Sequence, residues 1–215
     1  MNVRYPGLSA LCLFALVGHS PSAELVLRDA HFDFELLPTD FHYDLSGVTT
    51  NGSSDDSFDR HAGVAAGVLY SFAGPGDAHG IIVGGEVAIS QASYGSIGNL
   101  TAFSLRGQAG YGWALTDRWM VHGLAEVGYG MSTFDITQNS AFSAVSMDGT
   151  QLGYGVRATL QYSFNDLLHV SLKTGWQDVE YDLSGGGIDL TVNNSGLMIG
   201  LGISYRLSNT PRPLE

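Results

Sequence analysis

The sequence has little cysteine and no long apolar run: Cys12 is its only cysteine, and nowhere do eighteen apolar residues follow one another. A membrane-spanning helix needs about 20 consecutive apolar residues, so helical spans are excluded. Cys12 lies inside the apolar segment of a predicted leader, and Leu11 beside it does not suit a lipoprotein cleavage site. The mature chain therefore has no cysteine, which excludes disulfides and thiol chemistry.

Charge is also scarce and one-sided. Only 14% of the residues are charged, with 9 basic residues against 21 acidic ones. Nucleic acid needs a basic patch, so it is excluded as a partner. The 29 glycines and the 44% hydrophobic content suit long strands better than a charged soluble surface. The acidic side chains are expected to keep external loops solvated, or to meet divalent cations at an anionic membrane surface.

Residues 1–23 are typical of a secretory signal peptide. Arg4 supplies the positive charge, an apolar segment of ten residues follows, and small residues up to Ala23 form the cleavage region. Removal of Arg4 leaves 8 basic and 21 acidic residues, a formal charge of −13. We expect one mature domain over 24–207 and a short tail over 208–215.

The stretch 149–164 shows the pattern that organises the mature chain. Apolar and aromatic residues occupy every second position from Leu152 to Phe164, and small or polar residues with Arg157 at their centre occupy the others. Side chains of a β-strand alternate between two faces, so this stretch is a strand. It is longer than the roughly ten residues that cross a bilayer as a tilted strand. Its polar face is then the lumen of a barrel.

Seven further segments share this alternation, lying at 24–46, 60–72, 81–92, 100–115, 119–134, 167–182 and 195–207. Short connectors are predicted at 73–80, 116–118 and 165–166, and long external loops at 47–59, 93–99, 135–148 and 183–194. Eight strands with alternating short and long connectors are typical of an outer-membrane barrel. Pro38 interrupts the first segment. The first strand either ends near Leu37 or is bent there and continues above the membrane.

Aromatic residues fall at similar levels in this register. One girdle, near the short connectors, is predicted to contain Tyr70, Phe72, Tyr111, Trp113, Trp119, Tyr162, Phe164 and Tyr205. Phe103, Tyr129, Tyr154 and Trp176 lie toward the other rim. Aromatic belts mark the two membrane interfaces. The sequence therefore predicts an all-β fold, an eight-stranded antiparallel transmembrane β-barrel of the outer-membrane type. The competing fold is a soluble lipocalin-like barrel with the apolar face inward, which leaves the belts without a cause.

The leader, the eight alternating segments and the short turns resemble the small outer-membrane barrels of the OmpA, OmpX and opacity-protein type. The run Gly200 to Leu207 is similar to the glycine and alternating-hydrophobe assembly signal of that class, although eight residues follow it. The resemblance implies export to the outer membrane, insertion by the barrel assembly machinery, and contact with outer-membrane lipids and lipopolysaccharide. We expect a monomer.

Charged residues of the polar face fall at a similar depth on successive strands. This predicted lumen charge network consists of Glu86, Arg106, Glu126, Arg157 and Lys173. An eight-stranded lumen is narrow enough for side chains to fill it, and charges inside must pair. The network is interpreted as a plug of salt bridges, with a gate on a narrow solute path as the alternative. His122 and His169 are expected nearer the short turns, and His61 nearer the opposite end.

The predicted function is structural or interactional, with envelope integrity or surface contact made through acidic external loops. A small passive channel and a lipid A-modifying enzyme are the alternatives. For the enzyme, the polar candidates in or beside the first loop are His42, Ser57, Asp59 and His61. Because no nucleophile, base and acid can be placed within mutual reach, no catalytic residue is assigned. Neither a cofactor nor a metal site is expected, since the histidines are scattered.

Overall fold

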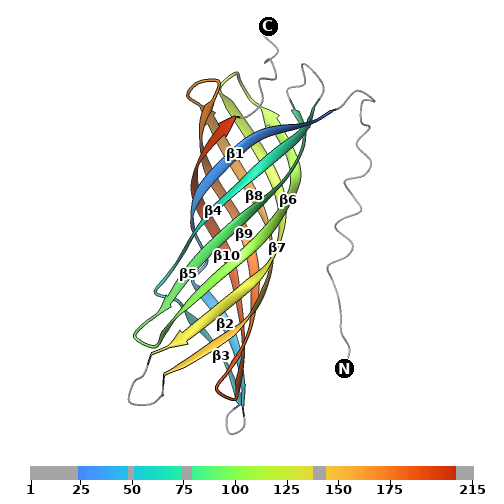
Figure 1. Cartoon of the computed structure of the whole chain (residues 1–215). Helices are drawn as coiled ribbons and strands as arrows, with labels where there is room; N and C mark the ends of the chain where they lie inside the picture. The colour runs from blue at the N-terminus through green and yellow to red at the C-terminus, as the bar shows by residue number, and fades with distance from the viewer. Residues whose placement is uncertain (1–23, 48–50, 74–78, 138–143, 207–215) are drawn as a thin grey trace.

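The computed structural model describes residues 24–47, 51–73, 79–137 and 144–206 (Figure 1). Its ten strands are β1 (Glu24–Leu36), β2 (Asp40–Gly47), β3 (Asn51–Ser57), β4 (Arg60–Ala73), β5 (His79–Tyr94), β6 (Gly98–Ala114), β7 (Trp119–Ile136), β8 (Val145–Ser163), β9 (Leu168–Gly185) and β10 (Ile188–Arg206). None of these residues forms a helix long and apolar enough to cross a membrane. The predicted signal peptide 1–23 and tail 208–215 lie outside the described residues.

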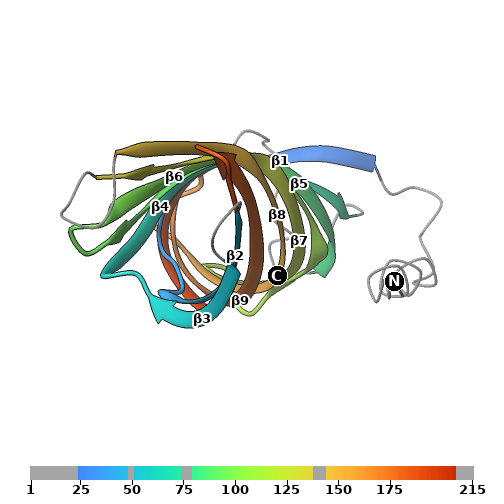
Figure 2. The same cartoon turned by 90° about the horizontal axis from the view of Figure 1, so that it is seen from below.

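Eight of the ten strands close into an antiparallel barrel, and we call each of these eight wall strands a stave. The sheet runs β1-β4-β5-β6-β7-β8-β9-β10, and β10 pairs back onto β1 to complete the ring. Figure 2 shows the closed ring from below. Because every stave has a neighbour on each side, the main-chain hydrogen bonds are satisfied within the sheet, as a lipid environment requires. The predicted eight-stranded antiparallel barrel is confirmed.

The first stave is bent at Pro38 and continues beyond it as β2. β10 pairs with β1 up to the pair Leu36–Ile199 and with β2 from Phe41–Asn194 onward. The amide Nδ2 of Asn194 donates hydrogen bonds to the Pro38 carbonyl (3.0 Å) and the Asp40 carbonyl (2.8 Å). These bonds occupy carbonyl groups at the break, where the ladder is interrupted. Of the two possibilities left open by the sequence, the structure has the bent strand.

The strands extend further than predicted, and the predicted long external loops are wrong in extent. β3 lies within the first of them, and the others shrink to residues 95–97, 137–144 and 186–187. β8 and β10 have 19 residues each. A strand of that length tilted by about 45° rises roughly 45 Å, well beyond an apolar band about 25 Å tall. The barrel therefore continues far outside the membrane, past the end opposite the short turns; we call this part the external half.

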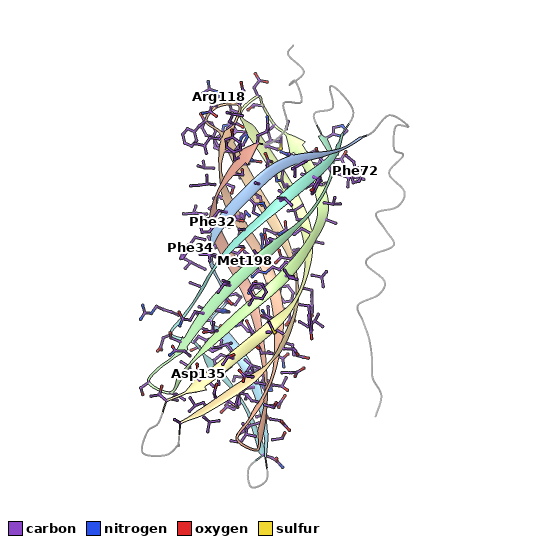
Figure 3. The ribbon with its side chains drawn as sticks, in the orientation of Figure 1. Phe32, Phe34, Phe72, Arg118, Asp135 and Met198 are labelled. Carbon is purple, nitrogen blue, oxygen red and sulfur yellow. The ribbon has the colours of Figure 1, made fainter. Side chains whose placement is uncertain are left out.

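The outer surface nearer the short turns is apolar. Phe32 and Phe34 of β1 are 54% and 48% exposed and point away from the barrel (Figure 3). Other exposed apolar side chains on this band are Val87, Ile89, Leu105, Val127, Val156, Leu172, Ile199, Leu201 and Ile203. An exposed apolar surface of this size is a membrane-facing surface. The soluble barrel with an apolar interior along its whole length is thereby excluded.

In the external half the polarity of the two faces is reversed. The buried side chains there form an apolar group, the external core, made of Phe41, Phe58, Ala92, Leu100, Ala102, Met147, Tyr181, Leu183, Leu190 and Val192. Phe41 stacks on Phe58 with 4.3 Å between ring centroids. The strands continue beyond the membrane because burial of these side chains inside the sheet stabilises them in water. The tight β9–β10 turn is made by Gly186 and Gly187, both at positive φ.

Candidate functional site

Seven charged side chains of the lumen each lie opposite a glycine on a neighbouring strand. The pairs are Asp33–Gly202, Glu35–Gly63, Glu86–Gly67, Arg106–Gly128, Glu126–Gly155, Arg157–Gly175 and Lys173–Gly200. Since an eight-stranded lumen is just wide enough for side chains to fill, each long side chain needs a position without one beside it. The glycines inside the strands therefore make room for these seven charged side chains, which together with His31 we call the charged layer.

We expect Gly128→Val to destabilise the barrel. A Cβ at this position would lie 2.9 Å from Arg106 Cγ, inside contact distance. Overpacking of this kind costs about 1–3 kcal/mol. The measurement is urea unfolding of protein refolded into lipid vesicles. Gly107→Val is the matched control, because Gly107 faces outward and its Cβ would have its nearest neighbour at 4.0 Å. Equal stability of the two variants would contradict the packing role of Gly128.

Arg157 is the centre of the charged layer. Its Nη2 lies 2.8 Å from Glu126 Oε2, 3.1 Å from Glu35 Oε1 and 3.4 Å from Glu86 Oε1. Arg106 Nη1 lies 2.8 Å from Glu35 Oε2 and 3.1 Å from Glu86 Oε1. These carboxylates are almost fully buried. Two guanidinium groups thus bind three carboxylates across the lumen, and the fork of an arginine suits such multiple contacts.

A second part of the layer lies next to it on β1 and β9. Lys173 Nζ donates a hydrogen bond to Asp33 Oδ2. His31 Nε2 lies 3.2 Å from Glu86 Oε2 and 3.5 Å from Asp33 Oδ2. The layer has four carboxylates and three fixed cations, and His31 supplies a fourth positive charge when protonated. All five residues of the predicted network are brought together here.

Sequence reasoning missed three members of the layer, all on β1: His31, Asp33 and Glu35. The signal was present, because these residues alternate with Phe32, Phe34 and Leu36. The uncertain extent of the first strand around Pro38 kept them out of the predicted set. His122 and His169, expected nearer the short turns, are buried in the lumen.

The ligand atoms of His31, Asp33 and Glu86 lie within 4.8 Å of one another, close enough to hold a metal ion. The carboxylates, however, are already bonded to cationic side chains: Asp33 to Lys173, and Glu86 to Arg106 and Arg157. A metal ion would have to displace these cations, so the donor set suits a salt-bridge network better than a metal centre.

The external core forms a second layer across the lumen, on the side of the charged layer that lies away from the short turns. Tyr181 and Met147, 2% and 1% exposed, belong to it. A cavity of about 30 Å³ is lined among others by Arg106 and Glu126 of the charged layer and by Tyr181 of the external core. Two layers of side chains of opposite character thus follow one another along the lumen.

Four of the predicted girdle residues, Trp113, Trp119, Phe164 and Tyr205, are exposed on the outer face. Phe72, labelled in Figure 3, lies near the end of β4 at a short turn. Tyr111 packs on Trp113 and Trp119 on Tyr162, each with 4.8 Å between ring centroids. Phe164 packs edge-on against Tyr162 at 5.2 Å. Tyr70, Phe72 and Tyr205 lie in the last residues of β4 and β10. Aromatic rings gathered at one end of the apolar band are typical of a membrane interface.

The polar residues considered for an enzyme do not converge. His42 is exposed, and its Nδ1 lies 2.8 Å from Asp55 Oδ1. His61 is buried, and its Nδ1 lies 2.8 Å from the Pro38 carbonyl. Asp59 accepts a hydrogen bond from the Gly95 amide (2.8 Å). With one histidine facing solvent and the other turned inward, these groups do not form a nucleophile, base and acid within mutual reach.

The hydrogen bond with Asp55 raises the pKa of His42, and nearby Asp44 adds to this. The ion pair therefore supports the β2–β3 hairpin at low pH and is lost as pH rises through the raised pKa. We expect the NMR titration midpoint of His42 to lie above the ordinary value of about 6.5. Asp55→Asn should lower it, and Ser57→Ala should leave it unchanged. A midpoint that does not respond to Asp55→Asn would contradict the pairing.

Comparison with protein-family models and with curated proteins finds no match. Among solved structures, the outer membrane protein OprG from Pseudomonas aeruginosa is similar, with a TM-score of 0.51 and 15% identity over 84% of this chain and 96% of that one. Neisserial surface protein A gives 0.45 and 11%, over 86% and 99%. The attachment invasion locus protein Ail of Yersinia pestis gives 0.41 and 15%, over 85% and 100%.

The likeness to OprG concerns the fold alone. The closed ring of staves and the apolar outer band indicate a barrel that spans a membrane. This chain is an eight-stranded antiparallel transmembrane β-barrel of the small outer-membrane type.

Proposed function

We propose that the protein is a closed, non-conducting barrel that acts through the outer surface of its external half, in envelope integrity or surface contact. Its leader 1–23 directs export, the barrel assembly machinery inserts it, and it works as a monomer among lipopolysaccharide and outer-membrane lipids. The observation that carries the proposal is the succession of a charged layer and an apolar layer along the lumen. We infer that the two layers close the lumen twice and leave no continuous path for ions.

The surface available for contact is strongly acidic. The acidic residues described on the external half are Asp40, Asp44, Asp55, Asp56, Asp59, Asp135, Asp148, Asp178, Glu180, Asp182 and Asp189. Among the described residues of that half, Arg60 is the sole lysine or arginine. Most of these acids lie on strands, which corrects the expectation of acidic loops. A rigid sheet displays its charges at fixed spacing, so this surface favours cationic partners over anionic ones.

Planar-bilayer recording tests the closure. We expect the refolded mature chain to insert without steady conductance, because both layers would have to open for ions to pass. An open porin recorded in the same bilayers shows that the assay detects a pore. Insertion is checked by heat-modifiable gel migration of the same sample. Steady, salt-dependent conductance steps from the native protein, absent after heat denaturation, would overturn the proposal in favour of a passive channel.

A further inference from the structure

β3 is the one strand among the described residues that has a neighbour on a single side. It pairs with β2, and the sheet order ends there, whereas every other strand is paired on both sides. All seven residues, Asn51 to Ser57, are exposed. The pairing with β2 runs from Asp40–Ser57 to Ser46–Asn51 without a shift of register. The external half therefore presents a regular strand edge that has no neighbour among the residues which the structure describes.

The main-chain groups on this edge can be identified. The Phe58 amide donates to the Thr39 carbonyl (2.9 Å), which fixes which residues face β2. Since hydrogen-bonded and non-hydrogen-bonded pairs alternate in antiparallel strands, Asp56 and Ser54 also bond to β2. The main-chain groups of Asp55 and Ser53 then point away from β2. The free edge thus offers donors and acceptors at every second residue.

The strand nearest to this edge, β5, reaches only the end of β3 that is next to Asp56. β5 ends at Tyr94, whose hydroxyl donates to Asp56 Oδ2. This hydrogen bond raises the pKa of Tyr94 to about 12, so the phenol remains a donor at neutral pH. Beyond Tyr94 the chain turns back toward β6. The edge from Asn51 to Asp55 is left without a main-chain partner among the described residues.

The side chains around the edge select its occupant. Native edge strands are commonly protected by proline, a bulge or charged side chains. β3 has no proline and no bulge. Its charges are Asp55 and Asp56, with Asp40 and Asp44 exposed on β2 beside it, so the edge repels acidic strands and leaves basic ones free to pair. A second copy of β3 would bring like charges together across the new pair, which is destabilising. A strand that carries lysine or arginine would meet opposite charges.

We propose that β3 accepts an extended, lysine- or arginine-bearing segment of another protein as an added strand. Main-chain hydrogen bonds to Ser53 and Asp55 supply the strand pairing, and the aspartates supply the selectivity for a basic sequence. This inference rests on the proposed function, because it names the partner chemistry of the external surface.

The probe is a short synthetic peptide of alternating threonine and lysine, added to the full mature chain in lipid nanodiscs. Amide hydrogen exchange is followed by NMR. Strand addition should protect the amides of Ser53 and Asp55, whereas those of Ser54 and Asp56, already bonded to β2, should change little. Protection that is absent, or equal at all four amides, would overturn the proposal.

Two variants separate the main-chain and charge contributions. Ser53→Pro removes a donor on the free edge, where proline is tolerated, and should weaken binding about tenfold, the effect of one lost hydrogen bond. Ser53→Ala keeps the donor and should bind as the native protein does. Asp55→Asn with Asp56→Asn should weaken binding several-fold and reduce its salt dependence. Heat-modifiable migration shows that each variant is folded.

A peptide of the same sequence with every main-chain amide N-methylated distinguishes strand addition from simple attraction. It should bind at least about tenfold more weakly, because it lacks the donors. Equal binding of this peptide, or equal binding to Ser53→Pro and Ser53→Ala, would overturn the proposal. A barrel that stays closed in bilayers but fails these tests refutes the strand addition alone, whereas a conducting barrel refutes the proposed function.

Discussion

Replacing Arg157 by methionine is expected to destabilise the barrel by about 3–5 kcal/mol, the cost of breaking a buried charge network by removing one partner. Its guanidinium contacts Glu35, Glu86 and Glu126 within 3.4 Å and is fully buried. Without it, the layer keeps its four carboxylates but only two fixed cations. Methionine fills much of the volume of arginine, so the loss reports the charge rather than a cavity.

The free energy is measured by urea unfolding in lipid vesicles, followed by heat-modifiable migration and tryptophan fluorescence. Arg118→Met, on an exposed turn, is the control and should change stability by less than about 0.5 kcal/mol. Arg157→Met combined with Glu86→Gln removes one charge of each sign and should recover much of the loss. A single Arg157→Met variant as stable as the native protein would show that the charges are solvated rather than closely packed.

Lysine at Leu190 is expected to cost about 3 kcal/mol or more, although this residue faces the inside of the barrel. Leu190 belongs to the external core and is 8% exposed. Leu201 on the same strand faces lipid and is 63% exposed. Lysine at Leu201 should cost about 2–4 kcal/mol at mid-membrane depth. On β10, a new charge is thus destabilising on the inner face in the external half and on the outer face in the membrane.

Asp189→Lys provides the matched control for Leu190, since Asp189 is its exposed neighbour on β10. It should be nearly neutral. The same vesicle-based unfolding assay measures all three variants. If lysine at Leu190 were tolerated as well as at Asp189, the interior of the external half would be open to water, as in a pore, and the second closure would be wrong.

In the external half the apolar side chains face inward instead of outward. This reversal explains why sequence analysis ended the strands too early there. Period-two alternation reveals that a strand has two faces, and aromatic belts tell which face meets lipid. Beyond the belts the inner face becomes the apolar one, as with Tyr181 and Leu183 on β9. If the apolar face is assumed to point outward beyond the belts as well, the alternation no longer fits, and a loop is predicted at 183–194. The strand in fact continues to Gly185.

The sequence predicted only part of the charged layer, because the extent of the first strand was uncertain. Five of its residues were found because they lie at similar depth on uninterrupted strands. Asp33 and Glu35 carry the same alternation on β1, but Pro38 left the end of that strand open. Which carboxylate meets which arginine depends on the stagger between staves, as when Glu35 of β1 meets Arg106 of β6. Alternation within one strand contains no information on that stagger.

By itself, the sequence determined that this chain is an eight-stranded outer-membrane barrel, because the lipid imposes one apolar face, its aromatic limits and an even number of staves. Only the tertiary structure decided the bend at Pro38, the pairs within the charged layer, the external core and the free edge of β3. These depend on contacts between residues far apart in the chain, where packing inside a closed sheet, and not local alternation, sets the free energy.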